Sequence, residues 1–221
     1  MKTIFPILFL LCVSRFASSQ SPADTNNPVM NLKDGVLVVR LRTQTNKINK
    51  LKEWMAGETP GTPVYQRLED QIEEVKTEVA SENRIVRKAF GDLYQYSDVL
   101  FFFDTLANAL KEGKTSGIFL NENMEVDPAL KLGDRFYLVA GVGSIPSSEA
   151  ASSQEQIIIY DRNYNLMTDP FPGYSRKFSI LSLFKSFFLT GEELLRFKTR
   201  ESVEWLNRKF TRYSGRLRNS G

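Results

Sequence analysis

The chain has 221 residues, with 29 lysines and arginines against 26 aspartates and glutamates, one cysteine and no histidine. Without histidine it offers no Ser–His or Cys–His nucleophilic pair, no histidine ligand for haem and none of the usual zinc sites. The formal charge of +3 is too small to predict a global field for nucleic acid. About 200 residues can bury roughly 70% of their surface, so a hydrophobic core alone can stabilise such a domain.

Residues 1–19 have the three-part pattern of a secretory signal peptide. A basic start precedes a mostly apolar stretch to Phe16, and small residues follow at 17–19. Cys12 does not follow a small residue, so we do not expect a lipid anchor there. Cleavage would leave a chain that begins at Gln20 and contains no cysteine. These features predict an exported protein.

The polar segment 20–33 contains two prolines, and we expect a flexible leader there. A single α/β domain is then expected over 34–213, with its first strand in the β-branched run 36–41. The last residues, 214–221, are predicted to form a disordered tail.

The range 41–90 predicts a helical hairpin after that strand. Helical spacing over 43–55 and 64–90 is interrupted by a run rich in proline and glycine at 57–63. The second helix carries a narrow, heptad-like apolar stripe, which is typical of a coiled coil for oligomerisation or partner binding. Because the stripe lasts only three to four heptads, we favour ordinary helices packed on their own sheet.

The run 98–103 is apolar on both faces, which predicts a strand in the middle of a covered sheet. Alternating strands and helices early in the chain, followed by paired strands, predict a mixed sheet flanked by helices. The other expected strands are 117–120, 135–140 and 156–160, and the other expected helices are 105–111, 179–189 and an amphipathic C-terminal helix over 190–213.

Asp104 follows the strand at 98–103, at the end where open α/β sheets bind ligands. The run 101–106 resembles the strand-end motif of haloacid-dehalogenase-type phosphatases. That motif needs a second acid two residues on, where this chain has Leu106. We therefore expect Asp104 to cap the next helix and keep it as a weak catalytic candidate, which would need Asp98, Asp134 or Asp161 nearby.

Other patterns are weaker. The acids at 127, 134, 161 and 169 lack the alternating spacing of a calcium loop, so no metal site is predicted and no cofactor is implied. Gly141 and Gly143 follow an expected strand and could expose backbone N–H groups to an anion. The third glycine of a dinucleotide motif is missing, so we expect a flexible turn there.

Two segments are candidate binding surfaces. The loop at 169–178 combines prolines, aromatic rings and cations, and Phe171, Tyr174 and Arg176 are its candidate binding residues. The alternative is a connection that covers a sheet edge. The segment Arg196–Arg218 holds eight lysines and arginines against two glutamates, so it could contact an anionic membrane. Its apolar stripe favours docking on the parent core instead.

The signal, the run 34–41, the hairpin, the aromatic strand and the segment 170–176 together resemble an uncharacterised family of bacterial exported proteins. The resemblance implies bacterial export and no particular activity. We expect a non-catalytic protein of the periplasm or outer cell surface that binds an envelope protein, glycan or surface, and no nucleic acid. A carboxylate- or metal-dependent envelope hydrolase using Asp104 is the alternative, and a membrane-surface adaptor acting through the basic C-terminal helix is the second. The oligomeric state is left open.

Overall fold

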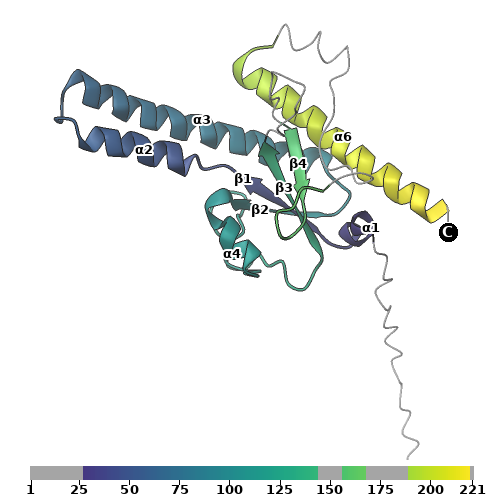
Figure 1. Ribbon diagram of the computed structural model, residues 1–221. Coiled ribbons are helices and arrows are strands. Elements are labelled where there is room, and N and C mark those ends of the chain that lie inside the picture. The colour runs from purple at the N-terminus through teal and green to yellow at the C-terminus, as the bar shows by residue number, and fades with distance from the viewer. Residues whose placement is uncertain (1–26, 144–155, 168–188, 220–221) are drawn as a thin grey trace, which may run out of the picture.

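The computed structural model describes residues 27–143, 156–167 and 189–219. They form one α/β domain with a mixed four-stranded sheet, as predicted (Figure 1). The elements are α1 (Pro28–Lys33), β1 (Val36–Leu41), α2 (Thr45–Ala56), α3 (Pro63–Leu93), β2 (Asp98–Phe103), the 3₁₀ helix η1 (Asp104–Leu106), α4 (Ala107–Lys111), β3 (Tyr137–Gly143), β4 (Gln156–Tyr160) and α6 (Gly191–Asn219). No helix in these ranges is both long and apolar enough to cross a bilayer.

The strand order is β2-β1-β3-β4. Strand β1 pairs in parallel with β2 on one side and β3 on the other, and β4 runs antiparallel to β3. The prediction that 98–103 lies in the middle of the sheet was therefore wrong, because β2 is an edge strand. Its free edge is covered by a non-strand segment, from which Leu120 N donates to Phe101 O at 2.8 Å. That cover explains why an edge strand carries Phe101 and Phe102 as buried residues.

The flexible leader predicted for 20–33 is also corrected, since its last six residues form α1. Asn27 caps this helix by accepting a hydrogen bond from Val29 N at 3.0 Å, and Pro28 occupies the first turn. Val29 and Leu32, three residues apart, are fully buried. Tyr96 donates its hydroxyl to Val29 O at 2.8 Å, which ties α1 to the core.

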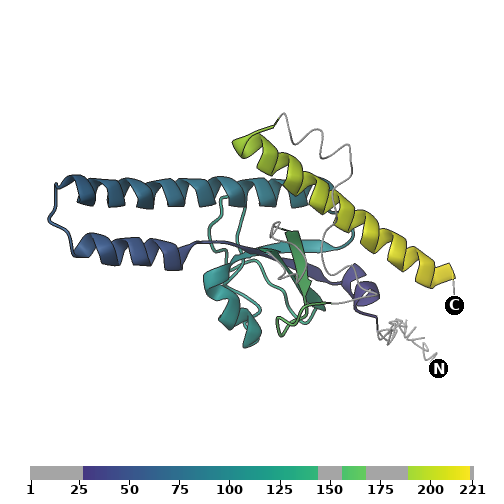
Figure 2. The same ribbon diagram turned by 45° about the horizontal axis from the view of Figure 1, so that its top comes forward.

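One face of the sheet is covered by α3 and α6 (Figure 2). Leu37, Val39 and Leu41 of β1 point to this side because side chains alternate along a strand. They pack with Phe90 of α3 and Phe210 of α6, both buried. This larger core confirms that the C-terminal helix docks on its own sheet.

The opposite face is covered by α4 and by the connection between α4 and β3. The strand predicted for 117–120 is not formed. Its apolar residues Ile118, Phe119 and Leu120 are buried, but only an isolated bridge joins Leu120 to Val126. Val36 and Val38 of β1 complete this second core. An apolar run of this length was predicted to be a strand, but here it is an irregular segment whose side chains are buried in the core.

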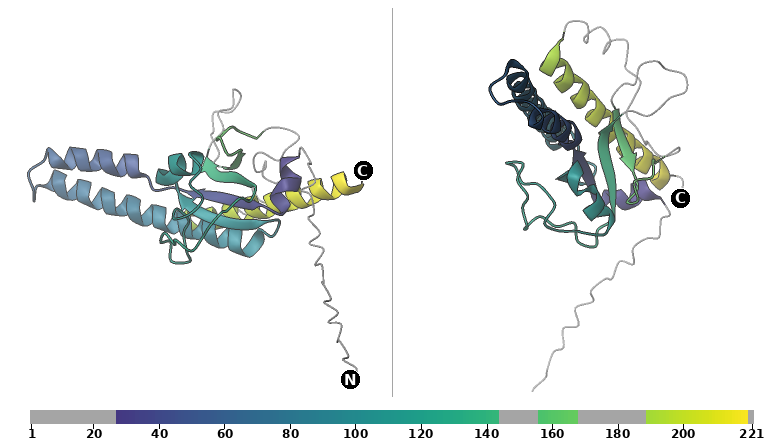
Figure 3. Two further views of the ribbon diagram at one scale, coloured as in Figure 1. Left: turned by 90° about the horizontal axis from the view of Figure 1, so that it is seen from below. Right: turned by 60° about the vertical axis from the view of Figure 1, so that its left-hand side comes forward.

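The predicted helical hairpin is present, and it extends away from the sheet (Figure 3). Its own small core contains Leu51 of α2 and Ile72, Val75 and Val79 of α3. The second half of α3 instead packs on the sheet. One helix of 31 residues thus serves both as an arm, paired with α2, and as a cover for the sheet. Packing on the sheet, the interpretation that we favoured, applies to the second half of α3.

The disordered tail predicted for 214–221 is corrected for its described part, 214–219. Helix α6 continues to Asn219, and Ser214 within it is buried. The hydroxyl of Ser214 donates to Thr211 O at 3.0 Å inside the helix. The helix predicted for 179–189 lies, apart from its last residue, outside the described residues.

Docking of α6 gives a direct stability test. The ring of Phe210 is fully buried against Tyr94 and Tyr96, with centroids 6.2 and 5.3 Å away. Phe210→Ala is expected to lower the free energy of unfolding by about 3–5 kcal/mol, measured by urea denaturation. The control is Arg212→Ala at an exposed position of the same helix, expected to change it by less than ~0.5 kcal/mol. Equal effects of the two substitutions would show that α6 does not dock as described.

Candidate functional site

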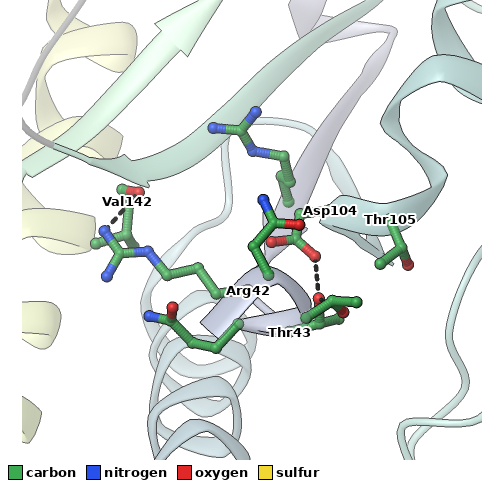
Figure 4. Close-up of a pocket in the computed structure, with 9 residues that line it drawn as sticks. Arg42, Thr43, Asp104, Thr105 and Val142 are labelled. Carbon is green, nitrogen blue, oxygen red and sulfur yellow. Dashed lines mark hydrogen bonds between the residues drawn. The ribbon is translucent and has the colours of Figure 1, made fainter. Parts of the chain in front are cut away.

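A pocket of about 440 Å³ opens at the carboxyl ends of the three parallel strands (Figure 4). Strand β2, which follows β1 in the chain, lies on one side of β1 in the sheet, and β3 lies on the other side. The strand order therefore reverses at β1, and the pocket lies at this point. Open α/β sheets bind ligands at this position, because loops diverge there and leave room. The pocket is lined by Arg40, Arg42, Thr43, Gln44, Thr45, Asn46, Asp104, Thr105 and Val142.

Two arginines dominate the charge of this pocket. Arg42 donates from Nη2 to Val142 O at 3.0 Å, which links the end of β1 to the end of β3. Arg40 lies over the rings of Tyr160 and Tyr164, 5.8 and 5.7 Å from their centroids. In the described part of the chain Arg40 is stacked on rings and is not paired with a carboxylate. The two rings hold its guanidinium group beside the pocket.

Gly141 has a structural role beside Arg40. It is the β3 residue paired with Arg40, and a Cβ there would lie 3.2 Å from the guanidinium Nη2. Gly141 and Gly143 belong to β3 and pair with β4, so the flexible turn expected at these glycines is wrong. Because glycine has no Cβ, the guanidinium group of Arg40 can lie close to the backbone of β3 at this position.

Asp104 is the carboxylate of the pocket, and it is half-buried. Thr43 donates its hydroxyl to Asp104 Oδ1 at 2.6 Å, and Thr43 Oγ1 also lies 2.7 Å from Thr45 Oγ1. The expected role of Asp104 as a helix cap is not found, because neither η1 nor α4 has a side-chain cap. Asp104 instead joins the ends of β1 and β2.

The link between β1 and α2 has an unusual backbone. Gln44 has φ 54° and ψ 25°, the left-handed region that a non-glycine residue adopts at a cost of about 1–3 kcal/mol. It provides no side-chain cap for α2, whose first residues Thr45 and Asn46 border the pocket. Asn83 of α3, nearly fully buried, donates to Arg42 O at 2.7 Å and holds this turn in place.

The other candidate acids do not reach this pocket. Asp98 lies at the opposite end of β2 and pairs with Arg135 at 2.8 Å. Asp161 accepts hydrogen bonds from Asn163 N and Asn165 N, both at 2.8 Å, in a turn after β4. Burial raises the pKa of Asp161, but those bonds and that of the Asn165 side chain lower it overall. Over the described ranges, no three acids gather as metal ligands.

The candidate binding residues Phe171, Tyr174 and Arg176 lie outside the described residues, so their positions are not compared with the pocket. The sequence reasoning missed Arg40, Arg42 and Thr43 as site residues. The sequence contained a clue to them. Arg40 stands near the end of the apolar run 36–41 and Arg42 and Thr43 follow it, and ligands bind beyond the carboxyl ends of strands in open α/β sheets. That they share a pocket with Asp104 required knowledge of which strands are neighbours.

Comparison of the chain with protein-family models, with curated proteins and with solved structures finds no match.

Tyr164 beside Arg40 gives a pH-dependent prediction. Its hydroxyl is buried and forms no hydrogen bond with the described residues, and burial raises its pKa from 10 to about 12. A folded-state pKa above the unfolded value means that stability is complete below pH 10 and is lost as pH rises toward 12. Tyr164→Phe should leave the free energy of unfolding at pH 7 unchanged or raise it, and should reduce the loss between pH 10 and 12.

The measurement is urea denaturation at pH 7, 10 and 11.5. Tyr65→Phe on the hairpin, for which no such burial is found, is the matched control. A marked loss of stability at pH 7 in Tyr164→Phe would show that the hydroxyl has a partner.

Proposed function

We propose that the protein is an exported, non-catalytic protein of the bacterial envelope that binds an anionic group of an envelope protein or glycan in the strand-end pocket. The observation that carries this proposal is that Arg40 and Arg42 line the same crevice as three threonine hydroxyl groups, at the carboxyl ends of the parallel strands. Arginine binds carboxylate, phosphate and sulfate through several parallel N–H donors, which suits such partners.

Three further features support an anionic ligand. Among the described residues, the lining has two arginines and one carboxylate. Thr43, Thr45 and Thr105 add hydroxyl groups that can donate to an oxyanion. The positive end of the α2 dipole also faces this region, since α2 begins at Thr45. The stacked and hydrogen-bonded arginines are held before any ligand arrives, which lowers the entropy lost on binding.

The hydrolase alternative has less support. Paired catalytic acids need two carboxylates within about 5–9 Å, and among the described residues that line the pocket Asp104 is the only carboxylate. Asp98 and Asp161 are engaged elsewhere, by Arg135 and by a turn. Asp104 accepts a hydrogen bond from Thr43 and shares the pocket with Arg40 and Arg42.

Arg40→Met tests the binding role while keeping much of the apolar stem of the side chain. Loss of one charge-assisted contact is worth about 1.5–3 kcal/mol, so affinity for the anion should fall roughly 10- to 100-fold. Isothermal titration with phosphate, sulfate and uronic-acid oligosaccharides measures the change. The matched control is Arg67→Met on the exposed hairpin, which should bind as the unaltered protein does. Equal affinity in both variants would exclude Arg40 from the site.

Asp104→Asn separates binding from hydrolysis. The substitution removes the negative charge of the pocket and keeps an acceptor for Thr43. A binding site for anions should then bind the same ligand more tightly, by a factor of a few, because like-charge repulsion is removed. An envelope hydrolase would instead lose its turnover of phosphate esters or glycosides in this variant. Weaker anion binding in Asp104→Asn, at unchanged stability, would contradict the proposal.

A further inference from the structure

The C-terminal half of α6 carries a one-signed charge. Residues 205–219 contain five arginines and lysines and no aspartate or glutamate. All five side chains are exposed: Arg208, Lys209, Arg212, Arg216 and Arg218. Arg208 also pairs with Glu204, just before this range, at 3.0 Å. Burial of Leu206 and Phe210 on the sheet fixes which side of the helix faces solvent. The cations therefore form a fixed surface on a docked helix, which we name the basic face.

A tryptophan lies within this surface. Trp205, Arg208, Lys209 and Arg212 border a shallow groove of about 320 Å³. The ammonium group of Lys209 lies 5.3 Å from the centroid of the half-exposed Trp205 ring. A tryptophan side chain next to cations is typical of protein surfaces that lie at the membrane–water interface.

The opposite end of the molecule has the other sign of charge. Residues 67–78 of the hairpin contain five acids and two cations. The tip of the hairpin and the C-terminal end of α6 point to opposite ends of the molecule (Figures 1 and 2). An anionic surface would attract the basic face and repel this part of the hairpin, so it would orient the protein.

We propose that the basic face binds the headgroups of anionic phospholipids and holds the protein on a membrane surface with the hairpin directed away from it. The helix stays docked, because the cations and Trp205 face outward while Val203, Leu206 and Phe210 remain in the core. Each lysine or arginine close to an anionic bilayer contributes about a fivefold factor in affinity. This site is separate from the strand-end pocket and does not depend on its ligand.

The test is sedimentation of the protein with vesicles of phosphatidylcholine alone or with one quarter phosphatidylglycerol. The full chain should bind the mixed vesicles and be released by 0.5 M salt, because salt screens surface charges. Lys209→Glu with Arg212→Glu should weaken binding about 25-fold or more, since two cations are lost. The matched control is Lys47→Glu with Lys50→Glu on α2, the same change of charge at exposed positions of the hairpin.

Every variant keeps the same N-terminal segment, so vesicle binding by residues 1–26 would be common to all of them. Circular dichroism and thermal unfolding verify that both double variants are folded. Equal binding of the two double variants to mixed vesicles, or equal binding of the full chain to both lipid compositions, would overturn the proposal. Binding of an acidic protein or nucleic acid without binding of vesicles would also overturn it. Arg40→Met should still bind vesicles, which separates this site from the pocket.

Discussion

Strand β1 makes hydrogen bonds to parallel strands on both sides, and the positions of the site and of the helices follow from this pairing. Its residues pair with β2 from Val36 to Leu41 and with β3 from Val36 to Arg40. Parallel strands end at the same edge of a sheet, so Thr43, Asp104 and Val142 meet although they are far apart in the chain. A parallel pair also requires a long crossover, which the two helices of the hairpin provide.

Helix α3 connects the sheet to the arm. Its first half packs with α2, and its second half covers the face of the sheet that α6 also covers. Asn83 lies between these halves, where its side chain reaches the backbone carbonyl of Arg42. A polar residue at a seam position thus stabilises the turn next to the pocket, because a buried backbone carbonyl needs a donor.

The two proposed surfaces use charge in different ways. In the pocket, Arg40 and Arg42 are held by rings and by a backbone carbonyl, and they suit one small anionic group. On α6 the cations are spread along an exposed helix, and they suit an extended surface with many weak contacts. A protein with both could stay at a membrane and bind a soluble or surface-attached ligand there.

The sequence by itself determined the fold class, the hairpin, most strand positions and the docking of the last helix, because each depends on a local periodicity of apolar residues. It also indicated that Asp104 ends a strand. It did not predict that 98–103 lies at an edge, that 28–33 is helical, or that 117–120 is irregular. The structure of these three segments depends on contacts with residues that are distant in the chain. Tyr96 donates a hydrogen bond to Val29 O, and Leu120 N donates one to Phe101 O. Only the tertiary structure decided the site, because strand order alone brings Thr43 to Asp104 and Arg40 opposite Gly141.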